Sequence, residues 1–145
     1  PVSLHTFIND IKQQYTQEIV FAKCKPRFYH EYALAKLKNE DYHLSVCSNA
    51  VRASVNMMLE KAQLTKYLDF SFSNQDVKIA KPHPEIYQKA IAKHGLTPKD
   101  CLVVEDNEKG IKAAIESGAH LLKVDTVEEV NYFNIKRRIN EIEEG

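Results

Sequence analysis

Residues 101–107, Cys-Leu-Val-Val-Glu-Asp-Asn, decide the fold, because an apolar run typical of a buried strand ends here in two adjacent acids. Carboxylates at the carboxyl edge of a parallel sheet lie where open α/β folds bind ligands. Adjacent residues of a regular strand point to opposite faces, so Glu105 and Asp106 can serve one ion only if the chain leaves the strand here. The sequence of residues 107–110, Asn-Glu-Lys-Gly, favours that exit. Taken alone, such a pair is more often a plain helix start with first-turn acids.

The segments around this run alternate between strand-like and helix-like patterns from residue 42 onward. Continuous apolar strands predict a parallel sheet covered by helices on both faces, a doubly wound α/β fold. Upstream, apolar residues at helical spacing from Leu4 to Ile19 predict an opening amphipathic helix. The expected strands are 42–47, 70–73, 101–104 and 121–124, and the other expected helices are 27–39, 51–62, 84–94, 108–117 and a C-terminal helix with Val130, Phe133 and Ile139 inward.

The composition is that of an ordinary globular protein, with 145 residues, 43% hydrophobic and 28% charged. Lys plus Arg and Asp plus Glu are equal at 20 each, so no net field draws the chain to nucleic acid or to a membrane surface. The three cysteines are widely spaced and form no metal-binding pair, which favours a reducing compartment. No apolar run is long enough for a membrane span, so we expect a cytoplasmic protein.

Ser48 and Asn49 follow the strand-like run that ends at Cys47. A hydroxyl together with free backbone N–H groups at a helix N-terminus makes an anion site suited to phosphate. The plainer interpretation, favoured for this motif alone, is a helix N-cap.

Lys81 lies in a proline-rich turn, Lys-Pro-His-Pro-Glu over residues 81–85. Pro82 restricts the lysine backbone to an extended conformation, and Pro84 fits the first position of a helix. A lysine on a restrained backbone suits a positive charge aimed at phosphate, although an exposed surface lysine is equally compatible with the pattern.

These three strand ends together supply an anion site, a fixed cation and metal ligands. That combination fits phosphoryl transfer, in which positioning and charge neutralisation do most of the catalysis. A hard cation such as Mg²⁺ is the cofactor expected, because it prefers oxygen ligands and takes one or two protein carboxylates.

The sequence resembles the haloacid dehalogenase-like hydrolase superfamily, in the branch with a helical cap that holds small-metabolite phosphatases and β-phosphoglucomutase. Residues 45–49, Ser-Val-Cys-Ser-Asn, resemble its second motif, residues 81–87, Lys-Pro-His-Pro-Glu-Ile-Tyr, its third, and residues 103–114 its fourth. The resemblance covers residues 24 to 125.

The resemblance implies a role for each motif. Ser48, with the Asn49 backbone, would bind the transferring phosphoryl oxygens, and Lys81 would neutralise the phosphoryl group and the nucleophile. Glu105 and Asp106 would hold Mg²⁺, directly or through water. This acid pair is typically absent from the dehalogenase branch, so its presence points to phosphate chemistry.

One departure from the family pattern is serious. The first motif, Asp-x-Asp-x-Thr, supplies the aspartyl nucleophile on the central strand, and this sequence contains no Asp-x-Asp. We therefore expect residues 1–23 to be the end of a helical cap and residues 24–145 to be an α/β core lacking its first strand. Two half-sheets with facing unpaired edges would not be stable, so an N-terminal piece, a swapped partner chain or a rearranged sheet must fill the gap.

Two functions remain open at this point. The first is the C-terminal part of a Mg²⁺-dependent phosphatase acting on a small phosphorylated metabolite through a phosphoaspartyl intermediate, with a phosphomutase as a close variant. The second is a non-catalytic truncated relative that keeps the phosphate and metal pocket as a binding or regulatory module. An unrelated nucleotide-binding domain is a weaker alternative, because no glycine-rich phosphate loop is present.

Overall fold

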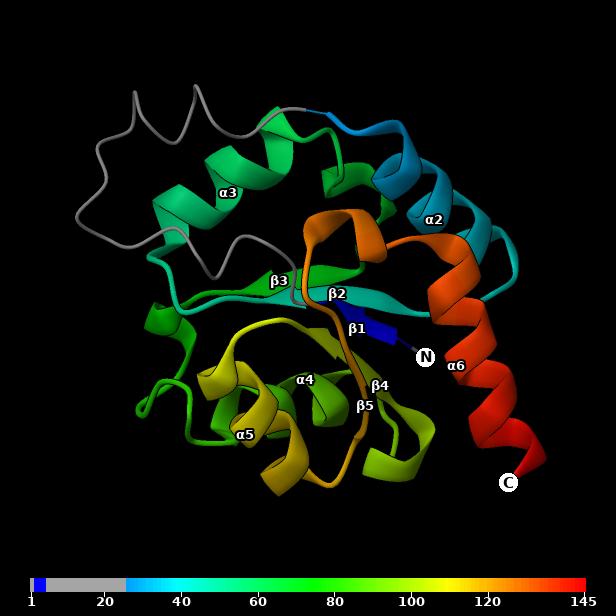
Figure 1. Ribbon diagram of the computed structural model, residues 1–145. Helices are drawn as coiled ribbons and strands as arrows, with labels where there is room; N and C mark the ends of the chain where they lie inside the picture. The colour runs from blue at the N-terminus through cyan, green and yellow to red at the C-terminus, as the bar shows by residue number, and fades with distance from the viewer. Residues whose placement is uncertain (1, 5–25) are drawn as a thin grey trace.

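The computed structural model describes residues 2–4 and 26–145, which form a parallel five-stranded sheet with helices on both faces (Figure 1). The strand order is β3-β2-β1-β4-β5, and each neighbouring pair is parallel. The expected doubly wound α/β fold is confirmed. The strands are β1 Val2–Leu4, β2 Leu44–Cys47, β3 Phe70–Phe72, β4 Leu102–Glu105 and β5 His120–Lys123.

Helices cover the sheet in two layers, with α2, α3 and α6 on one side and α4 and α5 on the other (Figure 1). Their bounds are α2 Phe28–Asn39, α3 Arg52–Lys61, α4 Glu85–Lys93, α5 Glu108–Ser117 and α6 Tyr132–Glu144. Within the described part of the chain, none of these helices has the length and apolar character needed to cross a membrane.

Alternation along the strands divides the core into two clusters. In β4, Leu102 and Val104 pack with α2, α3 and α6, whereas Val103 packs with α4 and α5. In β2, Val46 belongs to the first cluster and Cys47 to the second. Because successive strand residues point to opposite faces, Glu105 is directed to the α4 and α5 side, where Tyr87 of α4 lies.

Most expected elements are found within two residues of their predicted bounds. Gly118 ends α5 with φ +86°, the left-handed conformation in which glycine carries no Cβ penalty. Two details differ from the expectation. Phe133 is 73% exposed and lies outside the core of α6, and the N-cap of α3 is Val51, so Ser48 and Asn49 occupy the loop before the helix.

The centre of the sheet holds the largest difference from the sequence analysis. We expected a helix beginning at Leu4 and an empty central position, but Val2–Leu4 form β1 between β2 and β4. Val2 pairs with both Leu44 and Leu102. The chain's own first residues therefore fill the expected gap, and none of the three is an aspartate. The rest of the expected opening helix and the division at residue 23 fall outside the described residues.

Candidate functional site

The loop after β2 places Ser48 and Asn49 at the carboxyl edge of the sheet. Ser48 is fully buried, its N–H donates to the Phe72 carbonyl at 3.0 Å, and its Oγ accepts the Ala50 N–H at 3.1 Å. Because the hydroxyl oxygen accepts this bond, the hydroxyl proton remains a donor. The loop is thus held by the neighbouring strand and by its own turn.

The Asn49 side chain holds the backbone of Lys81. Its Nδ2 donates to the Lys81 carbonyl at 3.2 Å, and its Oδ1 accepts the Lys81 N–H at 3.1 Å. A side-chain amide that pairs with both backbone groups of one residue fixes that residue's position. Asn49, predicted as a backbone ligand of phosphate, therefore also positions the lysine through its side chain.

Lys81 is buried, in contrast to the alternative of an exposed surface lysine. Its Nζ donates to the Cys47 carbonyl at 3.0 Å and lies 3.5 Å from Glu105 Oε2. The amine therefore lies between the end of β2 and the end of β4, two strands that are separated by β1 in the sheet. A buried charge needs such partners, because the loss of its hydration is costly.

Glu105, the last residue of β4, is fully buried and makes hydrogen bonds through both carboxylate oxygens. Tyr87 Oη donates to Oε2 at 2.8 Å, and the N–H groups of Asp106 and Asn107 bond Oε1 at 3.0 and 3.1 Å. The first turn of α5 also lies against this carboxylate. A Cβ added at Gly110 would lie 2.0 Å from Oε2, so any other residue here would force the carboxylate or α5 to shift.

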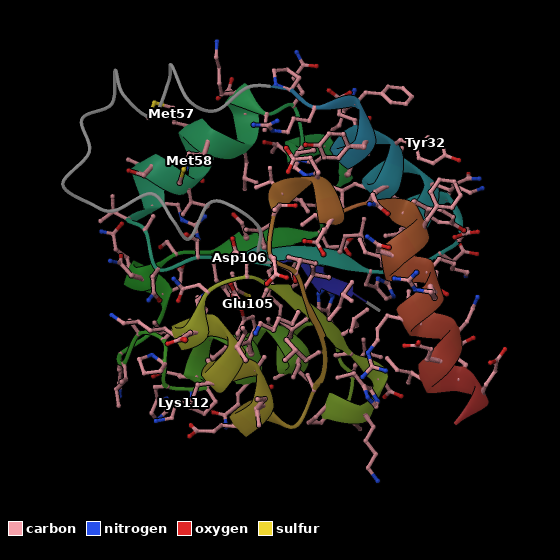
Figure 2. All side chains as sticks on the ribbon, in the orientation of Figure 1. Tyr32, Met57, Met58, Glu105, Asp106 and Lys112 are labelled. Carbon is pink, nitrogen blue, oxygen red and sulfur yellow. The ribbon has the colours of Figure 1, made fainter. Side chains whose placement is uncertain are left out.

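Asp106 is the more accessible acid of the pair. It follows the end of β4, and Figure 2 shows its side chain next to that of Glu105 where β4 gives way to α5. The chain leaves the strand at this point, as expected, so the two acids are not forced onto opposite faces. Asn49 and Asp106 are partly exposed, whereas Ser48, Lys81 and Glu105 are buried.

Burial and opposite charges act against each other in this cluster. Burial lowers the pKa of Lys81 to about 7, and the carboxylates of Glu105 and Asp106 oppose that shift. Burial also raises the pKa of Glu105, opposed by the Lys81 amine and the Tyr87 hydroxyl. Burial and the Glu105 charge raise the pKa of Tyr87 well above its usual value, so its hydroxyl stays protonated and donates.

Sequence reasoning did not identify two members of this site. Tyr87 and Gly110 lie within the stretches that resemble the third and fourth motifs, but neither was given a role in the site. For Tyr87 the available signal was a hydroxyl on a core-facing stripe, which requires a hydrogen-bond partner when buried. For Gly110 it was a glycine three residues into an expected helix, where glycine is unfavourable unless space is lacking.

The comparisons with known proteins agree with this architecture. Residues 2–124 match the family described as haloacid dehalogenase-like hydrolase. A haloacid dehalogenase-like hydrolase domain-containing protein of Arabidopsis thaliana is 44% identical over 78 residues, 52% of this chain and 25% of that protein. The pyrophosphatase PpaX of Bacillus mycoides is 27% identical over 135 residues, 84% of this chain and 62% of that protein.

Among solved structures, a β-phosphoglucomutase of Clostridium difficile matches with a TM-score of 0.72 and 20% identity, covering 88% of this chain and 63% of that one. At this identity the match shows the fold. The chain spans less than two thirds of the length of each of these three proteins. Because the family match extends over most of the sequence, the chain belongs to the haloacid dehalogenase-like hydrolase family.

Proposed function

We propose that this chain forms the phosphate- and Mg²⁺-binding part of a phosphatase that hydrolyses a small phosphorylated metabolite. The observation that carries the proposal is the position of the Lys81 amine, 3.0 Å from the Cys47 carbonyl and 3.5 Å from Glu105 Oε2. The amine thus contacts both the end of β2, next to Ser48, and the end of β4, where the two acids lie. Three motifs from separate βα units thus meet at one edge, where phosphoryl transfer needs them.

The chain's own residues would hold the phosphoryl group from two sides. The Ser48 hydroxyl and the backbone of the loop at Asn49 would donate to its oxygens, and the Lys81 amine would offset its charge. A phosphoryl group beside the amine would raise the pKa of Lys81 from about 7, since a nearby negative charge favours the protonated form. Binding of the anion and charging of the lysine would therefore support each other.

The two acids fit a hard divalent cation by their chemistry and charge. Two carboxylates face a single ammonium in this cluster, so the edge keeps an excess of oxygen donors and of negative charge. Asp106, partly exposed, would be the direct ligand, and Glu105, already bonded by Tyr87 and two backbone N–H groups, would act through its charge or through water. Bound Mg²⁺ would neutralise charge on the phosphoryl oxygens.

The nucleophile in this proposal is an aspartate that does not belong to these 145 residues. Its carboxylate would attack phosphorus as the ester P–O bond breaks, and water would then release phosphate from the aspartyl phosphate. Support comes from the sequence, which contains no Asp-x-Asp.

The test has a binding part and a turnover part. We expect calorimetry to detect inorganic phosphate binding that requires Mg²⁺, and Asp106→Asn to weaken it at least about tenfold. Glu116→Gln, an exposed carboxylate change on α5, is the matched control and should leave it unchanged. Phosphate binding that is indifferent to Mg²⁺ and to Asp106 would contradict the proposed site.

Turnover is measured on a panel of small phosphoesters. We expect the 145-residue chain alone to release no phosphate, and a version extended by the sequence its reading frame encodes before Pro1 to do so with Mg²⁺. Failure of the extended protein on the whole panel would exclude the enzyme.

The second candidate is a non-catalytic module that binds phosphate and metal. It is favoured by one observation, the presence of Val2–Leu4 at the strand position where the family pattern requires an aspartate. It predicts Mg²⁺-dependent phosphate binding by the chain without turnover in either version of the protein. The reading frame before Pro1 separates the two, because an Asp-x-Asp-x-Thr encoded there favours the enzyme.

A further inference from the structure

Three side chains with metal-binding atoms meet at the amino edge of the sheet, opposite to the phosphate site. His43 precedes β2, Asp69 precedes β3, and His94 is the C-cap of α4. One ligand atom from each lies within 4.8 Å of the others. Since β2 has four residues at about 3.3 Å each, roughly 13 Å of strand separates this cluster from Ser48.

The spacing of these atoms is close to what one ion requires. The His43 Nδ1 lies 3.5 Å from Asp69 Oδ2. Ligand atoms about 2.1 Å from a tetrahedral ion lie about 3.4 Å apart. The His43–Asp69 pair already meets that value, and the separations of the other ligand atoms do not exceed 4.8 Å.

Each of the three positions is supported by other contacts. The Leu44 N–H donates to Asp69 Oδ2 at 2.9 Å, which fixes the carboxylate against the start of β2. His94 Nε2 lies 3.0 Å from Ser45 Oγ, and its ring centroid lies 4.6 Å from that of Phe70. Histidines that bind metals usually bond an oxygen through the ring nitrogen that is not coordinated, and Ser45 Oγ lies within reach of His94 Nε2.

Solvent reaches this cluster, unlike the buried charges at the other edge. The side chains of His43 and Asp69 are 58% and 38% exposed, and His94 is half-buried. An ion could therefore enter without opening the core, and water could complete its coordination. Two imidazoles and one carboxylate favour a borderline ion such as Zn²⁺ over Mg²⁺, which prefers oxygen ligands alone.

We infer that His43, Asp69 and His94 form a second metal site, which takes one Zn²⁺-class ion and is independent of the phosphate site. The ion would join the segments that precede β2 and β3 to the end of α4. Because an ion that binds the folded chain stabilises it by mass action, occupancy would raise the melting temperature.

The test is a Zn²⁺ titration of the intact 145-residue chain by calorimetry, with saturating Mg²⁺ present to occupy the carboxyl edge. We expect one Zn²⁺ per chain and a rise in melting temperature. His43→Ala and Asp69→Asn should each weaken Zn²⁺ binding at least about tenfold. Asp69→Asn keeps an oxygen that can accept the Leu44 N–H, so it separates the loss of charge from the loss of fold.

His120→Ala is the matched control, because His120 begins β5 at the same edge outside the cluster. It should leave Zn²⁺ affinity unchanged, and circular dichroism should show each variant folded. Visible absorption bands of four-coordinate Co²⁺, lost in His43→Ala, would support the ligand set. The inference is overturned if Zn²⁺ does not bind saturably, if His43→Ala and Asp69→Asn bind it normally, or if Asp106→Asn alone abolishes binding.

Discussion

The two edges of the sheet are built in opposite ways. At the carboxyl edge, Lys81 and Glu105 are almost completely buried and each makes several polar contacts. At the amino edge, the side chains of His43 and Asp69 are 58% and 38% exposed and lie 3.5 Å apart. One edge buries its charges behind neighbouring backbone, and the other leaves its ligand atoms accessible to water.

The side chains at the carboxyl edge are held in one arrangement, whereas those at the amino edge are open to a ligand from solvent. A buried charge must be paired and hydrogen-bonded, so the carboxyl edge has few alternative arrangements. An exposed ion pair contributes little to stability, so the amino edge can rearrange around an ion at small cost. Mutations should therefore affect stability strongly at the first edge, and mainly ligand binding at the second.

The largest expected effect is that of Lys81→Met. This change leaves the Glu105 carboxylate buried without its ammonium partner, and we expect it to lower the free energy of unfolding by about 3–5 kcal/mol. Urea denaturation at pH 7 measures it. The double variant Lys81→Met/Glu105→Gln should recover much of the loss. If Lys81→Met lowered the free energy of unfolding by less than about 1 kcal/mol, the carboxyl edge would matter no more for stability than an exposed ion pair does.

Gly110→Ala should follow in size. The new Cβ would lie 2.0 Å from Glu105 Oε2 and 2.1 Å from its carboxyl carbon, so the carboxylate or α5 must shift. We expect a loss of about 1–3 kcal/mol. Lys112→Ala, an exposed change in the same helix (Figure 2), is the control. In a Glu105→Ala background the clash is absent, and Gly110→Ala should then cost nothing if this contact is the cause.

Asn49→Ala should cost about 1–2 kcal/mol, because it removes both side-chain hydrogen bonds to the Lys81 backbone. It should also weaken phosphate binding, since Lys81 is no longer held at the strand end. Asn56→Ala, which loses one exposed bond to Arg52, is the matched control for stability. If Asn49→Ala and Asn56→Ala lowered the free energy of unfolding equally, the two hydrogen bonds from Asn49 to the Lys81 backbone would not be important for stability.

The ion pair between Arg52, at the start of α3, and Asp76, after β3, has an intermediate degree of burial, and its contribution to stability depends on pH. Burial alone would raise the pKa of Asp76, but hydrogen bonds from Ser73 and Arg52 outweigh it and hold the pKa below its ordinary value of 3.8. Its stabilisation is therefore present above pH 3.8 and is lost as the pH falls through the lowered pKa.

Chemical denaturation of the wild type and Asp76→Asn between pH 6 and pH 2 measures this effect. We expect a difference of about 1 kcal/mol or less, because both side chains are about one third exposed. It should be constant from pH 6 to pH 5 and shrink at lower pH. A difference that grows toward pH 2 would reverse the assigned sign.

The smallest effect is expected for His43→Ala in metal-free buffer, within about 0.5 kcal/mol of the wild type. The side chain is mostly exposed, and its contact with Asp69 lies open to water. Thermal unfolding with and without Zn²⁺ should then separate the two proteins only when the ion is present. If His43→Ala lowered the free energy of unfolding by more than about 1 kcal/mol without metal, the amino edge would contribute to stability in the way expected only of the carboxyl edge.

The convergence of the carboxyl edge could be predicted from sequence because strand ends of a parallel sheet share one edge. Ser48, Lys81 and the acid pair each follow or flank an element with a clear pattern, and the Lys81 amine contacts the Cys47 carbonyl, next to Ser48, and Glu105. Tyr87 and Gly110 were missed because their roles depend on contacts with Glu105 across the fold. No local pattern encodes such a contact.

The amino edge was less predictable for the same reason. Asp69 lies just before β3, where it exchanges hydrogen bonds with Leu44. Its proximity to His43 and His94 arises from three distant segments. β1 was missed because apolar residues from Leu4 to Ile19 carry a helical periodicity, whereas the central sheet position is decided by pairing with β2 and β4.

That central pairing determines the order in which the sheet can be completed. Val2 meets Leu102 across a separation of about one hundred residues, so β1 cannot join β4 until the ribosome has delivered both. At about 5–20 residues per second the wait is roughly 5–20 s. Chains stalled before residue 101 should therefore be cleaved by protease at sites that finished chains protect. Until β4 has been made, the β1 edge that it will cover is unpaired, and an unpaired strand edge is a site at which another chain can add.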